Sequence, residues 1–162
     1  QLLRSWYAFF FQIPRLAEWV IGRGDLGNLM LSSSAAPGNF SDEVLQLYRD
    51  NGRRPDGLRG MINYYRALIM GGGGRRQRDL GTPLIEVPTL MVWGEDDSAL
   101  TIETTIDTDQ WVSDLTLRYL PRISHWVQQD APDEVNAMMR AFILGEEVPT
   151  MVWESRLVYD DV

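Results

Sequence analysis

One stretch in the second half of the chain, residues 89–93, is apolar at nearly every position instead of alternating apolar and polar residues. It follows Pro88 and ends at Gly94, and a second candidate strand runs from residue 115 to 120. Short uninterrupted apolar runs bounded by Pro and Gly are typical of parallel strands that are buried on both faces. The pattern predicts two parallel strands joined by a helical stretch around residues 104–112.

The first half of the chain has the spacing of helices. Ser41 precedes a segment with one apolar face that ends at Gly52, which predicts a helix capped by the serine hydroxyl. In residues 58–69, apolar side chains recur every three or four positions, as in a helix with one buried stripe. Tyr65 lies on this stripe and Tyr64 does not, so Tyr65 should face inward. The stripe consists of Leu58, Met61, Ile62, Tyr65, Leu68 and Ile69.

A glycine-rich segment divides the chain. Residues 71–74 are all glycine and are followed by the arginine-rich residues 75–78. Each glycine costs about 1 kcal/mol relative to alanine inside a helix, so this segment should hold neither helix nor strand. We therefore expect a helical domain at residues 1–80 and an α/β domain at residues 81–162.

The last helix is predicted by its two ends. Asp130 is expected to cap it, with Pro132 in its first turn, and Gly145 is expected to end it. Its apolar face would consist of Val135, Met138, Met139, Phe142 and Ile143. The remaining residues, 146–162, are interpreted as a docking tail.

Composition narrows the class of protein. The chain has 162 residues, 44% of them apolar, which suffices for one ordinary core or for a lid with part of a larger core. Its net charge of -8 disfavours nucleic acid and anionic membranes as partners. Without cysteine and with one histidine, the chain cannot form a disulfide framework, a thiolate nucleophile or a multi-histidine metal site. We expect no metal, no cofactor and a cytoplasmic location.

The N-terminal apolar run, residues 6–11, differs from a signal peptide because it is aromatic, is interrupted by Pro14 and precedes no small-x-small cleavage site. No stretch of the chain approaches the ~20 apolar residues that a transmembrane helix needs, so membrane insertion is not expected. Because the chain does not begin with methionine, we expect that it starts within a longer protein.

Two chemically useful side chains should lie just after the predicted strands. Asp97 follows the first strand, and His125, the single histidine, follows the second. The carboxyl ends of parallel strands form one edge of the sheet, so these side chains should meet there. A carboxylate on one imidazole nitrogen fixes the tautomer and leaves the other nitrogen free to take a proton from water. Glu95 or Asp96 could supply the acid instead, and a solvated acidic turn remains the structural alternative.

Residues 22–27 match the Gly-x-Gly-x-x-Gly spacing of dinucleotide sites. A convincing strand before them and an acidic residue in a strand about 20 positions later are both missing, so we reject a dinucleotide site. In so acidic a chain, the arginine cluster at residues 75–78 is better explained as a solvated linker than as a nucleic-acid contact.

The order strand, acid, helix, strand and histidine resembles the α/β-hydrolases, and among them the epoxide hydrolases. The resemblance extends from Ser5 to about Phe142. Four segments carry it: residues 5–14 (SWY through FQIP), 63–66 (NYYR), 88–97 (PTL through WGEDD) and 124–132 (SHW through QDAP). Residues 63–66 carry the feature that separates epoxide hydrolases from related dehalogenases.

The resemblance implies an α/β fold in which a helical lid domain is followed by the last strands and helices of an α/β-hydrolase parallel sheet. It makes Asp97 the orienting acid, His125 the base, and Tyr7 and Tyr65 the two lid tyrosines that hold the epoxide oxygen. The implied reaction opens the epoxide through an Asp ester, which a His-activated water hydrolyses to a vicinal diol.

The partners implied by the resemblance are water and a small apolar epoxide, of undetermined identity and stereochemistry. Trp126 and Phe10 would line the pocket that binds it. For Tyr7, the alternative role is that of an aromatic packing residue among the neighbouring Trp and Phe side chains.

The chain departs from the family pattern in one respect. The family's nucleophilic Asp belongs to a Gly-x-Asp-x-Gly turn, and neither this motif nor Gly-x-Ser-x-Gly occurs in the 162 residues. We expect the N-terminal half of the same enzyme to be a second chain that supplies the nucleophile, and the present chain to be inactive by itself. A homo-oligomer is also compatible with the sequence.

Two other functions stay open. A dehalogenase of the same superfamily would share the acid and the base but would bind halide through lid tryptophans, for which Trp6, Trp19 and Trp126 are candidates. A non-catalytic lid-and-sheet module, retained for assembly or small-molecule binding, is the other alternative.

Overall fold

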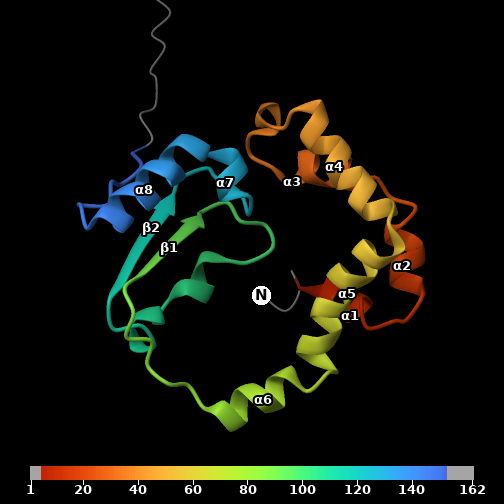
Figure 1. Cartoon of the computed structure of the whole chain (residues 1–162), viewed down its shortest axis with the longest axis horizontal. Coiled ribbons are helices and arrows are strands. Elements are labelled where there is room, and N and C mark those ends of the chain that lie inside the picture. The colour runs from red at the N-terminus through yellow and green to blue at the C-terminus, as the bar shows by residue number, and fades with distance from the viewer. Residues whose placement is uncertain (1–4, 153–162) are drawn as a thin grey trace, which may run out of the picture.

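The computed structural model describes residues 5–152 and has two parts. The first part is helical: α1 (Trp6–Phe10), α2 (Leu16–Ile21), α3 (Leu26–Ser33), the 3-10 turn η1 (Pro37–Asn39), α4 (Asp42–Arg53), α5 (Pro55–Ile69) and α6 (Gly73–Leu80). The second part contains β1 (Thr89–Gly94), the 3-10 turns η2 (Ile102–Thr105) and η3 (Thr108–Gln110), β2 (Leu115–Leu120), α7 (Val127–Asp130) and α8 (Pro132–Leu144). The two parts are arranged in a ring. They are joined along the chain through α6, and they contact each other again where α7 meets η1 (Figure 1).

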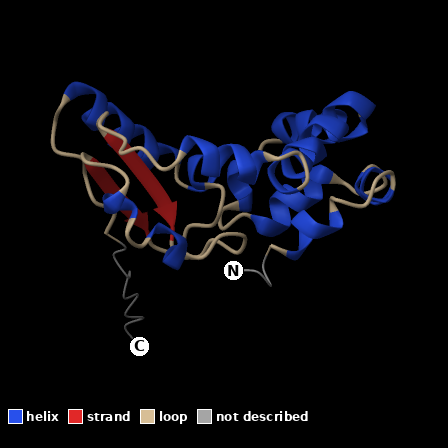
Figure 2. Cartoon of the chain, turned by 90° about the horizontal axis from the view of Figure 1, so that it is seen from below, coloured by secondary structure: helices blue, strands red, loops and turns tan. Residues whose placement is uncertain are grey.

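The two strands pair in parallel, from Thr89 opposite Leu115 to Gly94 opposite Leu120, as the apolar pattern predicts. Leu90 and Val92 of β1 pack against the cluster formed with α8. Burial on both faces is not found, because the side chains of β1 before Gly94 are only half-buried. Figure 2 shows the two-stranded sheet beside the helical part of the chain.

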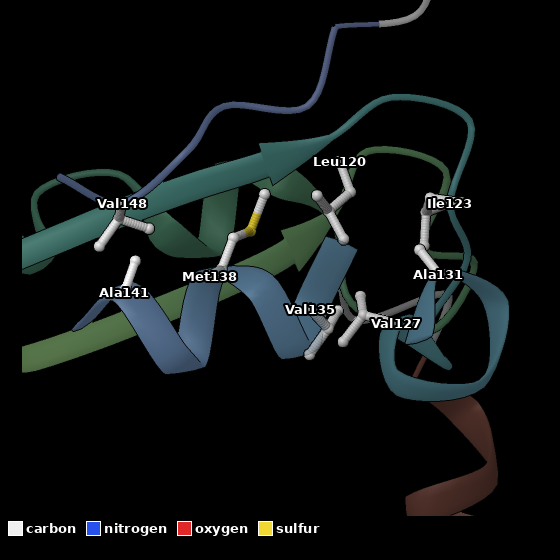
Figure 3. Packing of buried hydrophobic residues seen from close by; sticks show 8 residues of the cluster. All are labelled: Leu120, Ile123, Val127, Ala131, Val135, Met138, Ala141 and Val148. Carbon is white, nitrogen blue, oxygen red and sulfur yellow. The ribbon is translucent and has the colours of Figure 1, made fainter. Parts of the chain in front are cut away.

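The core of the second part lies between the strands and α8. Leu120 is fully buried, and Met138 reaches it from α8 (Figure 3). The buried cluster consists of Leu120, Ile123, Val127, Ala131, Val135, Met138, Ala141 and Val148. Gly145 ends α8 in the left-handed conformation, with φ of 69°, as predicted. Of the predicted apolar face, Met139 and Ile143 are exposed.

The helical part, which we call the lid, has two small cores. Ala17, Leu58 and Ile62 form the first, between α2 and α5. The second consists of Met30, Phe40 and Leu45. The Ser41 hydroxyl caps α4 by accepting a hydrogen bond from the Val44 N–H at 3.3 Å, as predicted.

The α5 stripe is narrower than predicted. Leu58 and Ile62 are buried, but Met61, Leu68 and Ile69 are exposed. Tyr65 is half-buried and Tyr64 is 71% exposed, which confirms that Tyr65 is the inward-facing tyrosine.

Three local predictions are wrong. Residues 73–80 form α6, because the break is confined to Gly72 at φ of 81°, while Gly73 and Gly74 occupy only the first turn and the Arg and Gln that follow are good helix formers. The predicted helix at residues 104–112 consists of the two short turns η2 and η3. Asp130 does not cap α8, since its carboxylate accepts hydrogen bonds from Ser124 and from the loop after α3.

The rejection of a dinucleotide site is supported by the fold, because residues 22–27 follow helix α2 instead of a strand. Among the helices in residues 5–152, none combines the length and the apolar composition that a transmembrane helix requires. After α8, Val148 is buried and its carbonyl accepts a 2.8 Å hydrogen bond from Arg118 Nη2. The end of the predicted docking tail, residues 153–162, lies outside the described residues.

Candidate active site

The loops after β1 and β2 lie against each other through their backbones. The Glu95 N–H donates to the Leu120 carbonyl and the Asp96 N–H donates to the Ile123 carbonyl, both at 3.0 Å. These bonds continue the parallel ladder beyond the strands, so the residues that follow each strand are held at one edge of the sheet.

Asp97 and His125 meet at this edge. The distance from His125 Nδ1 to Asp97 Oδ2 is 2.8 Å. The other carboxylate oxygen, Oδ1, accepts hydrogen bonds from the Ala99 and Leu100 N–H groups, each at 2.8 Å. Asp97 is buried and the His125 side chain is 37% exposed. An acid fixed by two backbone donors therefore holds a partly accessible imidazole by its Nδ1 atom.

The neighbouring carboxylates are not in this position. Glu95 and Asp96 are exposed, whereas Asp97 is buried against the imidazole. An open hollow of about 430 Å³ next to them is lined by Glu95, Asp96, Asp97 and Ser98. Among the three acidic residues of the turn, the geometry selects Asp97 as the partner of His125.

Trp126 connects the histidine loop to the lid. Its ring is 5.1 Å from the His125 ring at 83°, an edge-to-face contact. Its indole N–H donates to the Ser33 hydroxyl at 2.8 Å, and its ring packs against the lid cluster of Met30, Phe40 and Leu45. The side chain predicted to line the substrate pocket is thus fixed between the imidazole and the lid.

The two predicted lid tyrosines contact each other. The rings of Tyr7, on α1, and Tyr65, on α5, are 5.6 Å apart at 84°. Phe11 packs on both, at 5.7 Å from Tyr7 and 5.0 Å from Tyr65. Burial raises the pKa of Tyr65, and the adjacent Tyr7 raises it further. The Tyr65 hydroxyl therefore remains protonated, and able to donate, throughout the neutral range.

A polar clamp holds α1 against α5. Gln12 Nε2 donates to the Ala8 carbonyl at 2.8 Å and to the Tyr65 carbonyl at 3.3 Å. Arg66 Nε donates to the Phe11 carbonyl at 2.8 Å, and its guanidinium binds Glu18 through two contacts of 2.6 and 3.0 Å. The hydrogen bond from Arg66 lowers the pKa of Glu18 to about 2.

These clamp residues received no role from sequence reasoning. Gln12 and Arg66 lie inside segments that resemble the epoxide hydrolases, which is the signal that could have singled them out. The contacts of Phe10, in contrast, lie in the lid core of Ala17, Leu58 and Ile62, and its predicted place in a substrate pocket stays a prediction. Within residues 5–152, no cluster of three or more His, Asp and Glu side chains is arranged to hold a metal ion.

Comparison with known proteins identifies relatives over most of the chain. This chain is 33% identical over 150 residues to epoxide hydrolase 1 of Caenorhabditis elegans, and the match covers 88% of this chain and 36% of that protein. It is 34% identical over 154 residues to epoxide hydrolase 4 of Mus musculus, covering 90% of this chain and 41% of that protein. The chain thus spans less than half the length of each of these two relatives, and no family model matches it.

A solved structure has the same fold. The epoxide hydrolase of Bacillus megaterium in complex with an inhibitor superposes with a TM-score of 0.69 over 89% of this chain and 52% of that one, at 21% identity. The shared fold confirms the predicted fold class, an α/β fold in which helices are followed by parallel strands and further helices.

Proposed function

We propose that the chain is part of an epoxide hydrolase of the α/β-hydrolase superfamily and that it supplies the acid, the base and the lid of a site that converts an epoxide to a vicinal diol. The observation that carries this proposal is the 2.8 Å contact between His125 Nδ1 and Asp97 Oδ2. The names of the relatives from Caenorhabditis elegans and Mus musculus support the reaction class.

In the first step, a nucleophilic Asp carboxylate attacks one epoxide carbon, and the bond from that carbon to the ring oxygen breaks. The sequence contains no Gly-x-Asp-x-Gly turn, so we propose that this Asp belongs to a segment outside the 162 residues. Tyr7 and Tyr65 donate hydrogen bonds to the oxygen as negative charge develops on it. Their edge-to-face contact at 5.6 Å supports a joint role, since one oxygen can accept from both hydroxyls.

In the second step, His125 Nε2 takes a proton from water, and the hydroxide attacks the ester carbonyl. Asp97 keeps the Nδ1 proton in place and stabilises the imidazolium that forms. Collapse of the tetrahedral intermediate breaks the ester bond, and the protons of the resulting carboxylic acid and of the imidazolium pass to the two alkoxide oxygens, which releases the diol and restores the nucleophilic carboxylate and the neutral imidazole. The two backbone donors on Asp97 support this role, because they fix the carboxylate that orients the imidazole.

The test uses the full-length protein and styrene oxide as the probe. In His125→Gln, the first step should proceed and the second should stall, so intact mass should show a stable adduct of enzyme and substrate. In the wild type, a single turnover in ¹⁸O-water should give unlabelled diol, because the new diol oxygen comes from the Asp carboxylate. Labelled diol in the first turnover, or wild-type turnover by His125→Gln, would contradict the proposal.

The dehalogenase alternative receives less support. A halide site needs free indole donors, and Trp126 donates its N–H to Ser33 at 2.8 Å. Trp6 and Trp19 are 64% and 56% exposed, and Arg23 lies over the Trp19 ring. Release of halide from a haloalkane, with no diol formed from an epoxide, would favour the dehalogenase.

The alternative of a non-catalytic module predicts that the full-length protein does not depend on His125 for any turnover. Four further expectations stay predictions: that a second chain carries the nucleophile, that this chain is inactive by itself, that it forms a homo-oligomer and that it is cytoplasmic. Expression of this chain with and without the preceding part of the enzyme, followed by the diol assay, tests the first two together.

A further inference from the structure

Asp130 is a buried carboxylate that receives hydrogen bonds from two distant parts of the chain. From the histidine loop, the Ser124 N–H donates to Oδ2 at 3.0 Å, and the Ser124 hydroxyl donates to the same oxygen. From the lid, the Ala35 N–H donates to Oδ2 and the Ala36 N–H donates to Oδ1, both at 3.2 Å, while the Ser34 hydroxyl donates to Oδ1. One side chain thus joins the loop after α3 to the residue that precedes His125.

We propose that Asp130 is a positioning residue that couples the place of the lid to the orientation of His125. This inference rests on the proposed function, because it concerns the base of the same site.

The flanks of His125 support the coupling. Ser124 binds Asp130 directly, and its hydroxyl accepts a 3.2 Å hydrogen bond from the Trp126 N–H. The Trp126 indole in turn donates to Ser33 of the lid at 2.8 Å. The residues on both sides of the imidazole are therefore held by this network, and a shift of the lid loop would reach His125 through either one.

A second bond crosses between the parts at the same place. Asn39, in η1, donates from Nδ2 to the carbonyl oxygens of Gln129 and Asp130 at 2.8 and 3.2 Å. This bond holds the backbone of α7, while the carboxylate holds the loops on either side of it. Asp130 is thus fixed at both its backbone and its side chain.

The network requires a carboxylate. Burial by itself would raise the pKa of Asp130, but the hydrogen bonds from Ser124, Ser34 and Ala35 outweigh this effect and lower it, so the group is ionised at neutral pH. Each oxygen accepts from at least two donors. An asparagine could satisfy one set of donors, but its NH₂ group would then face the other set donor to donor. Asp130→Asn therefore breaks the network without changing the size of the side chain.

The experiment compares three variants of the full-length protein: Asp130→Asn, the lid variant Ser34→Ala and the control Asp133→Asn, which changes an exposed carboxylate in the first turn of α8. We expect Asp130→Asn to slow hydrolysis of the ester intermediate at least tenfold, because small displacements of a catalytic group cost up to about 10²-fold in rate. Formation of the ester should change less, so kcat falls more than the alkylation rate. Ser34→Ala should slow the same step in the same direction, and Asp133→Asn should leave both steps unchanged.

A second readout does not depend on activity. Amide hydrogen exchange at Ala35, Ala36 and Ser124 should accelerate together in Asp130→Asn, and Ser34→Ala should accelerate exchange at Ser124 across the interface. If exchange at Ser124 is unchanged, or if the variants lower only the thermal midpoint and leave ester hydrolysis intact, the coupling is wrong. If the wild type opens no epoxide, the proposed function fails, and the exchange measurement still decides whether Asp130 joins the two loops. Should Asp130→Asn fail to fold, Ser34→Ala carries both readouts.

Discussion

Gly94 lies directly against the backbone of Ser124: a Cβ atom at Gly94 would be 2.2 Å from the Ser124 carbonyl oxygen. The same atom would be 2.4 Å from the carbonyl oxygen of Ile123. Both obstacles are backbone atoms, so no rotation of a side chain can relieve the clash. The absence of a side chain at Gly94 is what allows the turn that carries Asp97 to lie on the loop that carries His125.

Gly94→Ala should therefore destabilise the protein by about 3 kcal/mol, at the upper end of the range for overpacked sites, because the backbone of one loop must move. Urea denaturation of the full-length protein measures this effect. Gly60→Ala is the matched control, since a Cβ there would meet no atom within 4 Å and alanine favours the helix. Equal stability of the two variants would contradict the packing of the two loops.

Asp97→Asn should lower kcat roughly 10³-fold or more, because an amide does not hold the imidazole tautomer that accepts a proton from water. Asp96→Asn, at the exposed neighbour, should leave kcat within about twofold of the wild type. Steady-state diol formation by both variants decides between the two carboxylates. A large effect confined to Asp96→Asn would reverse the assignment.

Tyr65→Phe should slow epoxide opening roughly 10²–10³-fold, since one donor to the developing alkoxide is lost. Tyr64→Phe is its control, because Tyr64 is 71% exposed. Single-turnover alkylation rates separate this step from ester hydrolysis, which should be little affected. Because the pKa of Tyr65 is raised above 10.0, its contribution should persist up to about pH 10 and be lost only as the phenol ionises. A loss of this contribution near neutral pH would argue against Tyr65 as the donor.

Glu18→Gln should lower the free energy of unfolding by about 1 kcal/mol at pH 7, a discounted value because the Glu18–Arg66 pair is partly exposed. The pKa of Glu18 is lowered from 4.5 to about 2, so its stabilisation is present above pH 4.5 and is lost as the pH falls toward 2. The difference between wild type and variant should shrink over that interval. Denaturation at several pH values tests this, with Glu86→Gln at an exposed site as the control. A difference that is independent of pH would contradict the ion pair.

The features that could be predicted from the sequence are those that depend on residues close together in the chain. The apolar run between Pro88 and Gly94 predicted β1, because Pro and Gly mark the ends of a strand that they cannot continue. The spacing in α5 identified Tyr65 as the inward tyrosine, since helical periodicity fixes which side chains share a face. The position of Asp97 and His125 after parallel strands gave their contact, because the carboxyl ends of such strands meet at one edge.

What escaped prediction depends on distant partners. Asp130 precedes a proline and a helix, so local reasoning assigned it to a cap, but its donors include Ser34, which lies 96 residues away in the chain. Residues 73–80 are helical although residues 71–74 are all glycine. A single residue in the left-handed conformation, Gly72, is enough to separate α5 from α6. Gln12 and Arg66 donate to backbone carbonyls. Every residue has such a carbonyl, so the sequence does not indicate which one is the acceptor.

The end of α3 and the loop after it belong by sequence to the lid, but Trp126 is hydrogen-bonded to Ser33 and Asp130 to Ala35 of this segment. This has a practical consequence for engineering. A chimaera that exchanges lids between related enzymes at their apparent domain boundary would replace residues 33–39 together with the lid. The hydrogen bonds of this segment with Trp126 and Asp130 would then be lost. A chimaera that retains the recipient's own residues 33–39, and joins the foreign helices on either side of them, keeps His125 in position while the substrate preference is changed.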